Sequence, residues 1–352
     1  MLRPLLFLAL SAAVPTASRA DDEAVFAPLQ ALDARVATIG YRLAVANAPL
    51  CTIRMHATGL VIHDLAQYEP SRREAARRYF GFEAPIGVEA VVEGSPAAAA
   101  GVRPRDSLVA IDGQPIDLPF VTSSVAATTA RSLRIDAALN RAGADGALRL
   151  DLLRGGKPLT VELRPVEACR SRFEVSFDEV YDSAADGETV QVSVKLMQAF
   201  RNDDEAAFIL GHELAHNMLR HRVRLDEAGV KRGMFEGFGR SVGYIRRSEL
   251  EADIVGLAFA ANAGFDPAAA PRFWRWFGPK HAASIFMDRT HPRWSTRAAV
   301  LDGEAATLAQ GKSRPFDPPL LATARQPLSN DWQALLAGST RPAAATADRA
   351  AR

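Results

Sequence analysis

The stretch from Phe208 to Asn217 constrains the fold of this chain more than any other segment. It is an apolar run that carries His212, Glu213 and His216. In a helix of 3.6 residues per turn, His212 and His216 share one face, so both imidazoles can reach the same cation. Zinc is the cation that such a pair favours, and Glu213 is placed to take a proton from a metal-bound water. The alternative is a helix with two unrelated histidines.

A zinc site of this kind needs a third protein ligand, and the sequence excludes one common source. Leu219 and Arg222 occupy the positions where a metzincin pattern would have a glycine and a third histidine. His221 points off the face that the first two histidines share, which places it at the surface or behind the ligands. The third ligand is therefore expected on a later helix.

Residues 248–260 form that later helix, and they begin with three acidic side chains. Glu249 and Asp253 lie four residues apart on one face, whereas Glu251 points elsewhere. A ligand glutamate followed by an aspartate that accepts from a ligand imidazole is an arrangement that zinc sites favour. Two alternatives remain open: Glu251 forms a capping box with Ser248, or the acids are a solvated first turn.

The segment before the histidine helix predicts its support. Residues 188–194 alternate as a strand, and residues 195–200 form a short helix. Asn202 and the acids at 203–205 indicate a helix start, with negative charge at its N-terminus. The helix is expected to run to about His221.

The first 20 residues are typical of an export signal. A short basic start at Arg3 precedes an apolar run, and Ser18-Arg19-Ala20 offers small residues for cleavage after Ala20. The alternative is an uncleaved anchor, but the apolar run is short for a membrane span. We expect export, to the bacterial periplasm, and no transmembrane segment after cleavage. In that compartment the two cysteines, Cys51 and Cys169, are expected to form a disulfide rather than remain free thiols.

The residues between the two cysteines are rich in strand and turn signals. Residues 91–102 read Val-Val-Glu-Gly-Ser-Pro-Ala-Ala-Ala-Ala-Gly-Val, and Ala110-Ile-Asp-Gly-Gln-Pro-Ile116 follows. This order of turn residues resembles a PDZ domain of the bacterial HtrA type, apart from Arg105, where that family usually has glycine. The resemblance implies that an extended peptide adds to a sheet edge, with the loop at Gly59, Leu60 and Val61 holding its C-terminal carboxylate. The alternative is a PDZ fold that serves as a spacer.

Three separated motifs resemble the gluzincin family of HtpX and the CAAX prenyl endopeptidase, in particular its soluble exported members. They are His212-Glu-Leu-Ala-His216, Glu249-x-x-x-Asp253, and Thr290-His291-Pro292 with Arg297. The resemblance implies one zinc ion bound by His212, His216 and Glu249, with Glu213 as general base and Asp253 behind a ligand. It also implies that His291 lies near the metal, where it orients a transition-state oxygen or covers the zinc. Alternatively, His291-Pro292 marks a turn with proline at the first helical position, and Arg297 pairs at the surface.

One departure from that family concerns substrate positioning. Members commonly carry an Asn-Ala-aromatic-Ala run beside the cleft, and this chain has Asp182-Ser183-Ala184-Ala185. Residues 222–247 are rich in glycine and arginine, and we expect them to act as a mobile lid. Residues 340–352 are expected to be disordered.

These observations predict an α+β chain, with a mostly helical gluzincin domain, a small edge sheet and an inserted β-rich PDZ domain. The predicted function is a zinc metalloendopeptidase that cleaves protein or peptide substrates, with the PDZ domain recruiting or regulating them. Its rivals are a catalytically silent PDZ adaptor and a chaperone-like envelope assembly factor. A net charge of +1 gives no support for nucleic-acid binding. The expected divisions are a signal peptide at 1–20, peptidase segments at 21–56 and 167–310, the PDZ domain at 57–166, and a tail at 311–352.

Overall fold

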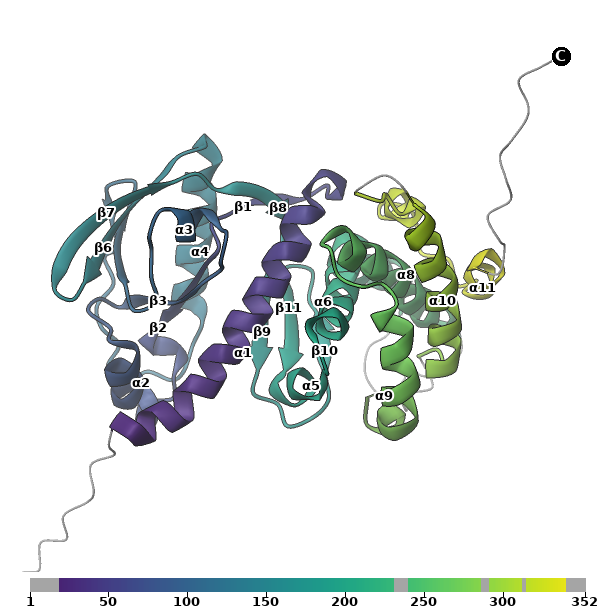
Figure 1. The fold of residues 1–352 in the computed structure, drawn as a ribbon, viewed down its shortest axis with the longest axis horizontal. Coiled ribbons are helices and arrows are strands. Elements are labelled where there is room, and N and C mark those ends of the chain that lie inside the picture. Colours follow the sequence, from purple (N-terminus) through teal and green to yellow (C-terminus); the bar gives the residue numbers. More distant parts are fainter. Residues whose placement is uncertain (1–18, 231–239, 286–290, 312–314, 340–352) are drawn as a thin grey trace, which may run out of the picture.

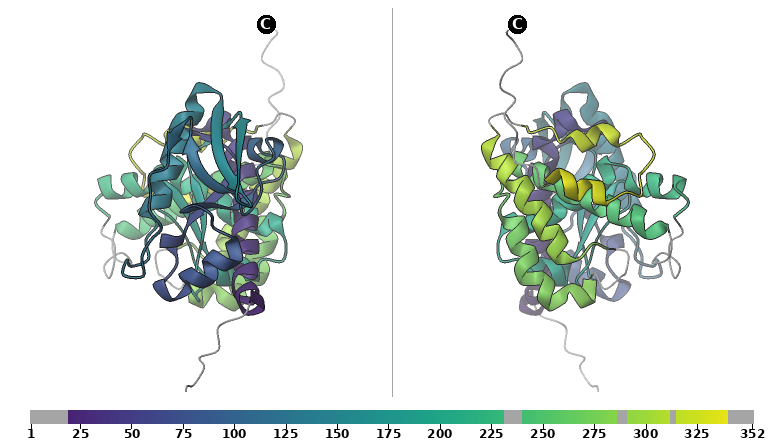
Figure 2. Two further views of the ribbon diagram at one scale, coloured as in Figure 1. Left: turned by 90° about the vertical axis from the view of Figure 1, so that its left-hand side faces the viewer. Right: turned by 90° about the vertical axis from the view of Figure 1, so that its right-hand side faces the viewer.

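The computed structural model describes residues 19–230, 240–285, 291–311 and 315–339. A β-rich half and a helical half lie at opposite ends of the molecule, and helix α1 (Arg19–Ala46) runs diagonally between them (Figure 1). Viewed from its two ends, the molecule shows mainly sheet on one side and mainly helices on the other (Figure 2). The predicted α+β class is confirmed. None of the described helices has the length and apolarity needed to cross a bilayer.

The β-rich half is a six-stranded antiparallel sheet in the order β2-β3-β4-β6-β7, with β5 beside β4. Strand β6 shows why this sheet forms, because its alternate residues Leu148, Leu150 and Leu152 are almost fully buried in the core of this half. Strand β2 lies at one edge of the sheet and pairs with β3 alone among the described strands. The elements of this half are β2 (Leu60–Asp64), α2 (Arg73–Phe80), β3 (Ile86–Val91), α3 (Pro96–Ala99), β4 (Ser107–Ile111), β5 (Gln114–Pro115), α4 (Ala130–Ala142), β6 (Leu148–Arg154) and β7 (Lys157–Leu163).

The helical half surrounds a three-stranded sheet in the order β10-β11-β9. Strand β11 pairs in parallel with β9 and antiparallel with β10. Its elements are β9 (Arg172–Ser176), β10 (Ser183–Ala185), β11 (Thr189–Ser193), α5 (Val194–Ala199), α6 (Asp203–Met218), α7 (His221–Glu227), α8 (Ser241–Asn262), α9 (Ala269–Ile285), α10 (Trp294–Gln310) and α11 (Gln333–Ser339).

A narrow neck joins the two halves. Strands β1 (Arg54–Ala57) and β8 (Val166–Cys169) form an antiparallel ribbon, with Arg54 opposite Cys169. The predicted disulfide between Cys51 and Cys169 is present, with the two Cα atoms 5.4 Å apart. It closes the ribbon at the end that leads into the helical half.

Helix α1 packs against both halves. Near its start, Phe26 stacks on Tyr79 of α2, and further along Val36, Ile39 and Leu43 enter the core of the helical half. Residues 21–56, expected as a segment of the peptidase domain, thus contain a long helix that also contacts the β-rich half, for which the sequence pattern gave no signal.

Helices α6 and α8 approach each other closely because each has a glycine at the crossing point. A Cβ atom on Gly256 would lie 2.6 Å from Cα of His212, and one on Gly211 would lie 2.7 Å from the backbone oxygen of Gly256. Any other residue at either position would therefore push the two backbones apart. This contact brings the histidines of α6 to the acids of α8.

The strand predicted at 188–194 and the short helix at 195–200 are observed within one residue, but three predictions at helix ends are wrong. The histidine helix ends at Met218 rather than at His221, because Arg220 has a left-handed backbone (φ 55°). Helix α8 begins at Ser241 rather than Ser248, so Ser248 is no cap, and its hydroxyl donates to the Ile245 carbonyl oxygen. Proline 292 precedes α10 and does not occupy its first position.

Regular structure covers half of the segment that was expected to form a lid. Of residues 222–247, one part belongs to α7 and another to the first turns of α8, while 231–239 lie outside the described residues. The expected disorder of residues 340–352 and most of the signal segment also lie outside the described residues.

Candidate metal centre

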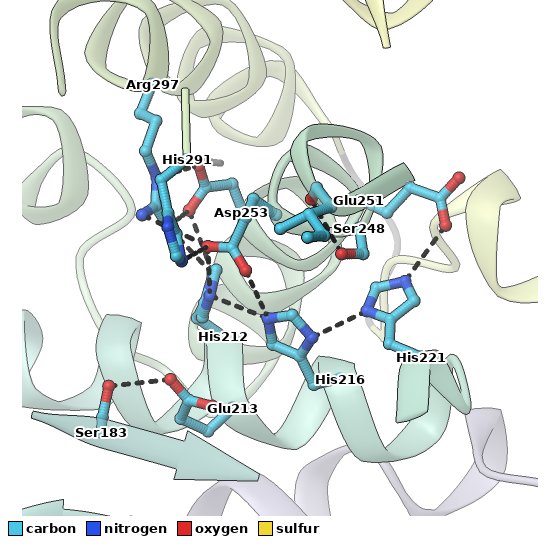
Figure 3. Close-up of polar contacts among 12 residues, drawn as sticks. Ser183, His212, Glu213, His216, His221, Ser248, Glu251, Asp253, His291 and Arg297 are labelled. Atoms are coloured by element: carbon cyan, nitrogen blue, oxygen red, sulfur yellow. Dashed lines mark hydrogen bonds and ion pairs between the residues drawn. The ribbon is translucent and has the colours of Figure 1, made fainter. Parts of the chain in front are cut away.

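Helix α6 positions two imidazoles side by side. The Asn202 side chain caps its start by accepting from the Glu205 amide at 3.0 Å, and three acids occupy its first turn. His212 and His216 then lie one turn apart, with their Nε2 atoms separated by 3.1 Å (Figure 3). Both side chains come from the helix that the sequence predicted for them.

Glu249 of α8 completes a group of three possible ligands. Its carboxylate oxygens lie 3.6 Å from Nε2 of His212 and 3.4 Å from Nε2 of His216. One ligand atom from each of the three residues falls within 4.8 Å of the others, and among the described residues no other group of His, Cys, Asp and Glu meets this condition. Two nitrogens and one carboxylate at this separation form a donor set typical of catalytic zinc.

Asp253 and Arg297 hold His212 from behind. The His212 Nδ1–H donates to Asp253 Oδ1 at 3.1 Å, and Arg297 donates to both Asp253 oxygens at 2.6 and 2.7 Å. Both are almost fully buried. Burial raises the pKa of Asp253, but Arg297 and His212 outweigh it and hold that pKa below its usual value. The alternative that Arg297 pairs at the surface is wrong.

His216 is held by a buried network that the sequence reasoning did not identify. Its Nδ1–H donates to Nδ1 of His221 at 2.9 Å, and the His221 Nε2–H donates to Glu251 at 3.2 Å. Glu251 also accepts from Arg224 at 3.0 Å and from Arg247 at 2.6 Å. Burial lowers the pKa of His221 to about 3, so its ring is neutral and carries one proton, as this chain of donors requires.

These two networks determine which ring nitrogens face the site. Because Nδ1 of both His212 and His216 carries the proton, each Nε2 presents a lone pair toward the other. Two such nitrogens repel each other at 3.1 Å unless a cation lies between them and Glu249. The arrangement therefore fits a metal ion. Burial lowers the pKa of His212, but Asp253 and Glu249 outweigh it and raise that pKa to about 9, so the two carboxylates favour a positive charge at this ring, either a proton or a metal ion at Nε2.

Glu213 faces strand β10. Its Oε1 accepts from the Ser183 hydroxyl at 2.8 Å, and the Glu213 side chain is buried beside the ligand group (Figure 3). Ser183 belongs to the segment that departs from the expected Asn-Ala-aromatic-Ala pattern. The serine found at this position therefore donates a hydrogen bond to the predicted general base. Burial and the charge of Glu213 raise the pKa of the neighbouring Asp182.

His291 lies at the open side of the group. Its Nε2 is 3.8 Å from Glu249 Oε2, and a quarter of its side chain is exposed. Nearby, Nη1 of Arg297 lies 3.6 Å from the same oxygen. Burial raises the pKa of Glu249, but His291 and the two ligand imidazoles outweigh it and hold that pKa well below its usual value. The structure thus places both residues of the third motif beside Glu249.

The predicted peptide loop lies at the start of edge strand β2, far along the chain from these ligands. Gly59 has φ 78°, and a Cβ there would meet the Ser95 side chain at 2.1 Å. The Leu60 amide donates to the Thr58 hydroxyl at 3.2 Å, and Val61 opposes Ala90 of β3. The loop therefore has the glycine-dependent turn that the prediction needs, but one of its amides already has a partner.

Comparison with protein families assigns both halves. Residues 181–243 and 227–305 match the model of peptidase family M48, which covers the histidine motif, Glu249 and Arg297. Over these residues the chain is similar to the M48 peptidases. Residues 87–134 match the model of the PDZ domain, which lies in the β-rich half. These two matches support the predicted metallopeptidase class and the predicted PDZ domain.

Two curated relatives also match part of the chain. A mitochondrial metalloendopeptidase OMA1 of Arabidopsis thaliana is 28% identical over 32% of this chain and 27% of its own length. The protein of the same name from Schizosaccharomyces pombe is 29% identical over 25% of this chain and 32% of its own length. The chain thus spans about a third or less of either relative's length. Among solved structures, the HtrA3 PDZ domain bound to a phage-derived ligand covers 32% of this chain and 88% of its own, with 16% identity and a TM-score of 0.23.

Proposed function

We propose that this chain is a zinc-dependent metalloendopeptidase in which His212, His216 and Glu249 bind one zinc ion. The observation that carries the proposal is the pair of Nε2 atoms 3.1 Å apart, both within 3.6 Å of a Glu249 oxygen. Each imidazole is fixed from behind by its own network, so the ligand atoms need little rearrangement on binding. Similarity to peptidase family M48 and to the two metalloendopeptidases supports the same activity.

Glu213 is the general base in this proposal. When bound, zinc polarises the scissile carbonyl group and lowers the pKa of the attacking water. The Glu213 carboxylate takes a proton from that water and passes it to the leaving amine. The Ser183 hydroxyl, 2.8 Å from Glu213, holds one carboxylate oxygen so that the other can face the substrate. His291, at the open side of the ligands, donates to the oxygen that becomes negative in the transition state.

Arg297 and Asp253 position the ligands without contacting substrate. Their paired charges keep His212 in the tautomer that binds metal, and Arg297 also faces Glu249. We assign the chain to the soluble branch that resembles HtpX and the CAAX prenyl endopeptidase, because all three of that branch's motifs are in place around the ligands.

The PDZ domain, residues 57–166, recruits or regulates substrate in this proposal. Its support is the open edge of strand β2, to which an extended peptide can add, with Gly59, Leu60 and Val61 near the peptide's C-terminus. We assign it to the HtrA type on the turn residues alone. The peptidase domain then comprises residues 21–56 and 167–310, and the neck disulfide joins its two segments.

We also propose that the protein is exported to a bacterial periplasm after cleavage of residues 1–20. The disulfide between Cys51 and Cys169 supports an oxidising compartment. A mass measurement of the protein recovered from periplasmic extract would test this. A mature chain that begins at Asp21 is expected, and an uncleaved chain in the cytoplasm would contradict it.

Zinc binding is tested by replacing the ligand on α8. We expect Glu249→Gln to weaken zinc binding by more than about 100-fold, beyond what the loss of a neighbouring hydrogen bond costs, and to abolish casein cleavage. The control is Glu227→Gln, an exposed glutamate at the end of α7, which should leave zinc content and cleavage unchanged. Full zinc content in Glu249→Gln would contradict the ligand assignment. Zinc in the wild type without any cleavage would instead favour the adaptor or chaperone-like function.

A further inference from the structure

A cavity of about 530 Å³ separates the PDZ domain from the peptidase domain. Edge strand β2 and helix α4 line it on the PDZ side, and helix α1 and strand β9 line it on the peptidase side. The peptidase wall is close-packed, because the Phe173 ring of β9 lies on Gly40 of α1 with no room for a Cβ atom. The edge to which a PDZ ligand adds therefore lies across the cavity from α1 and β9, which belong to the other domain. Figure 1 shows α1 running beside the β-rich half.

Four carboxyl groups converge on this cavity from four different elements. They are Asp33 of α1, Glu89 of β3, Asp136 of α4 and Glu174 of β9. Among the described residues of the lining, Arg172 is the one arginine or lysine, and its Nε lies 3.5 Å from Glu174. The lining thus carries more acidic than basic groups, and the acids come from both domains.

Three of the four acids have pKa values that burial raises. Burial raises the pKa of Asp33 to about 7, of Glu89 to about 8 and of Asp136 to about 7. The same burial lowers the pKa of the nearby His63 to about 3, so that imidazole supplies no positive charge. A cationic group that enters beside such carboxyl groups stabilises their ionised form.

The apolar lining and the edge of strand β2 indicate what kind of molecule the cavity binds. Leu60, Ile62 and Leu139 line the cavity, and Phe177 at the end of β9 lines it although 70% of its surface is exposed. An extended peptide satisfies the edge of β2 with its backbone and places alternate side chains into pockets. A small cation would leave both the strand edge and the apolar wall without partners.

We infer that the cavity binds an extended peptide segment that carries a lysine or arginine side chain, held between the PDZ domain and the peptidase domain. The backbone pairs with β2, and the basic side chain lies among Asp33, Glu89, Asp136 and Glu174. This inference rests on the proposed function only in that it concerns the peptide site of the same PDZ domain. It goes further in making Glu174 and Asp33, which lie outside the PDZ domain, part of that site.

The binding is tested with two fluorescein-labelled nonapeptides of alternating valine and threonine, amidated at the C-terminus, with lysine or glutamate in the centre. The full chain is used as the zinc-loaded Glu213→Gln variant, so that no cleavage interferes, and binding is followed by fluorescence anisotropy. We expect the lysine peptide to bind more than about tenfold more tightly than the glutamate peptide. Equal affinities, or no binding of the lysine peptide, would overturn the inference.

The contribution of the peptidase wall is tested with a matched pair of substitutions. Glu174→Gln should weaken binding of the lysine peptide about three- to tenfold and leave the glutamate peptide no weaker. Glu179→Gln removes an exposed glutamate five residues further on, which does not line the cavity, and should change neither affinity. Equal effects of the two substitutions would overturn the composite site. Because neither experiment needs proteolysis, a wild type without peptidase activity would refute the proposed function and leave this inference intact.

Discussion

Reduction of the disulfide between Cys51 and Cys169 should cost a free energy that depends on whether the PDZ domain folds by itself. The two cysteines are 118 residues apart in sequence. If the whole chain unfolds in one step, the loop-entropy relation gives about 5 kcal/mol for a loop of that length. If the PDZ domain stays folded, only residues 52–59 and 164–168 gain freedom, and about 13 residues give about 3 kcal/mol.

The separate core of the β-rich half favours the smaller value. Its buried leucines and valines pack among themselves, and the connection to the helical half is one ribbon and the face of α1. We therefore expect the free energy of unfolding of the peptidase domain to fall by about 3 kcal/mol on reduction.

Tryptophan fluorescence in urea reports on the helical half and not on the PDZ domain, because all four tryptophans (Trp274, Trp276, Trp294 and Trp332) follow the neck. Oxidised and reduced wild type are compared first, since their side chains are the same. The Cys51→Ala/Cys169→Ala variant then serves as a check, with a further loss for the buried side chains. A loss below about 1 kcal/mol would refute the loop argument, and a loss near 5 kcal/mol would refute independent folding of the PDZ domain.

Three further predictions concern buried charges and rings. His221→Gln should weaken zinc binding about 10–100-fold in a chelator competition, because it alters the acceptor that fixes His216, and a change below about twofold would contradict that role. Asp253→Asn should lower the free energy of unfolding in urea by about 3–5 kcal/mol, because it leaves the buried Arg297 charge without its carboxylate, and an unchanged urea midpoint would count against it. The pKa values of Asp33 and Glu89 are raised to about 7 and about 8, so the folded chain retains protons that the unfolded chain has lost above about pH 4, and stability falls as pH rises from 4 to 8. The Asp33→Asn/Glu89→Gln variant should therefore lose about 6 kcal/mol less than the wild type between pH 5 and pH 8 in urea titrations, about 3 kcal/mol for each carboxyl group, and parallel titrations would refute this.

The spacing of residues within each helix was sufficient to predict which side chains of the candidate metal centre share a helix face. His212 and His216 share a face because they are four residues apart, and so do Glu249 and Asp253. Spacing says nothing, however, about how closely two helices approach. That depends on Gly211 and Gly256, which the sequence reasoning passed over although both lie inside helices where glycine is costly.

The network behind His216 was missed for a different reason. His221 was placed on a continuous helix, where it would point away from the ligands, but the left-handed backbone of Arg220 turns it back toward His216. Arginine rarely adopts that conformation, so nothing local indicated the turn. Glu251 was interpreted as a possible cap because the helix start was placed at Ser248, and its pairing with Arg224 and Arg247 depends on contacts between separate helices.

The cavity between the domains also lay beyond sequence reasoning. The PDZ motif predicted an edge strand, and β2 is that edge. Helix α1 and strand β9 lie across the cavity from this edge, and they come from the segments before and after the PDZ domain. The acidic residues of these segments had no pattern that linked them to one another.

The most direct test of the central claim measures zinc content and casein cleavage on the same preparations of wild type and Glu213→Gln. The ligands of the metal are unchanged in this variant, so both proteins should contain one zinc ion per chain. Cleavage should fall about 10²- to 10⁴-fold in the variant, the contribution expected of a general base. Equal cleavage by two equally zinc-loaded proteins would contradict the assignment of Glu213, and with it the proposed mechanism.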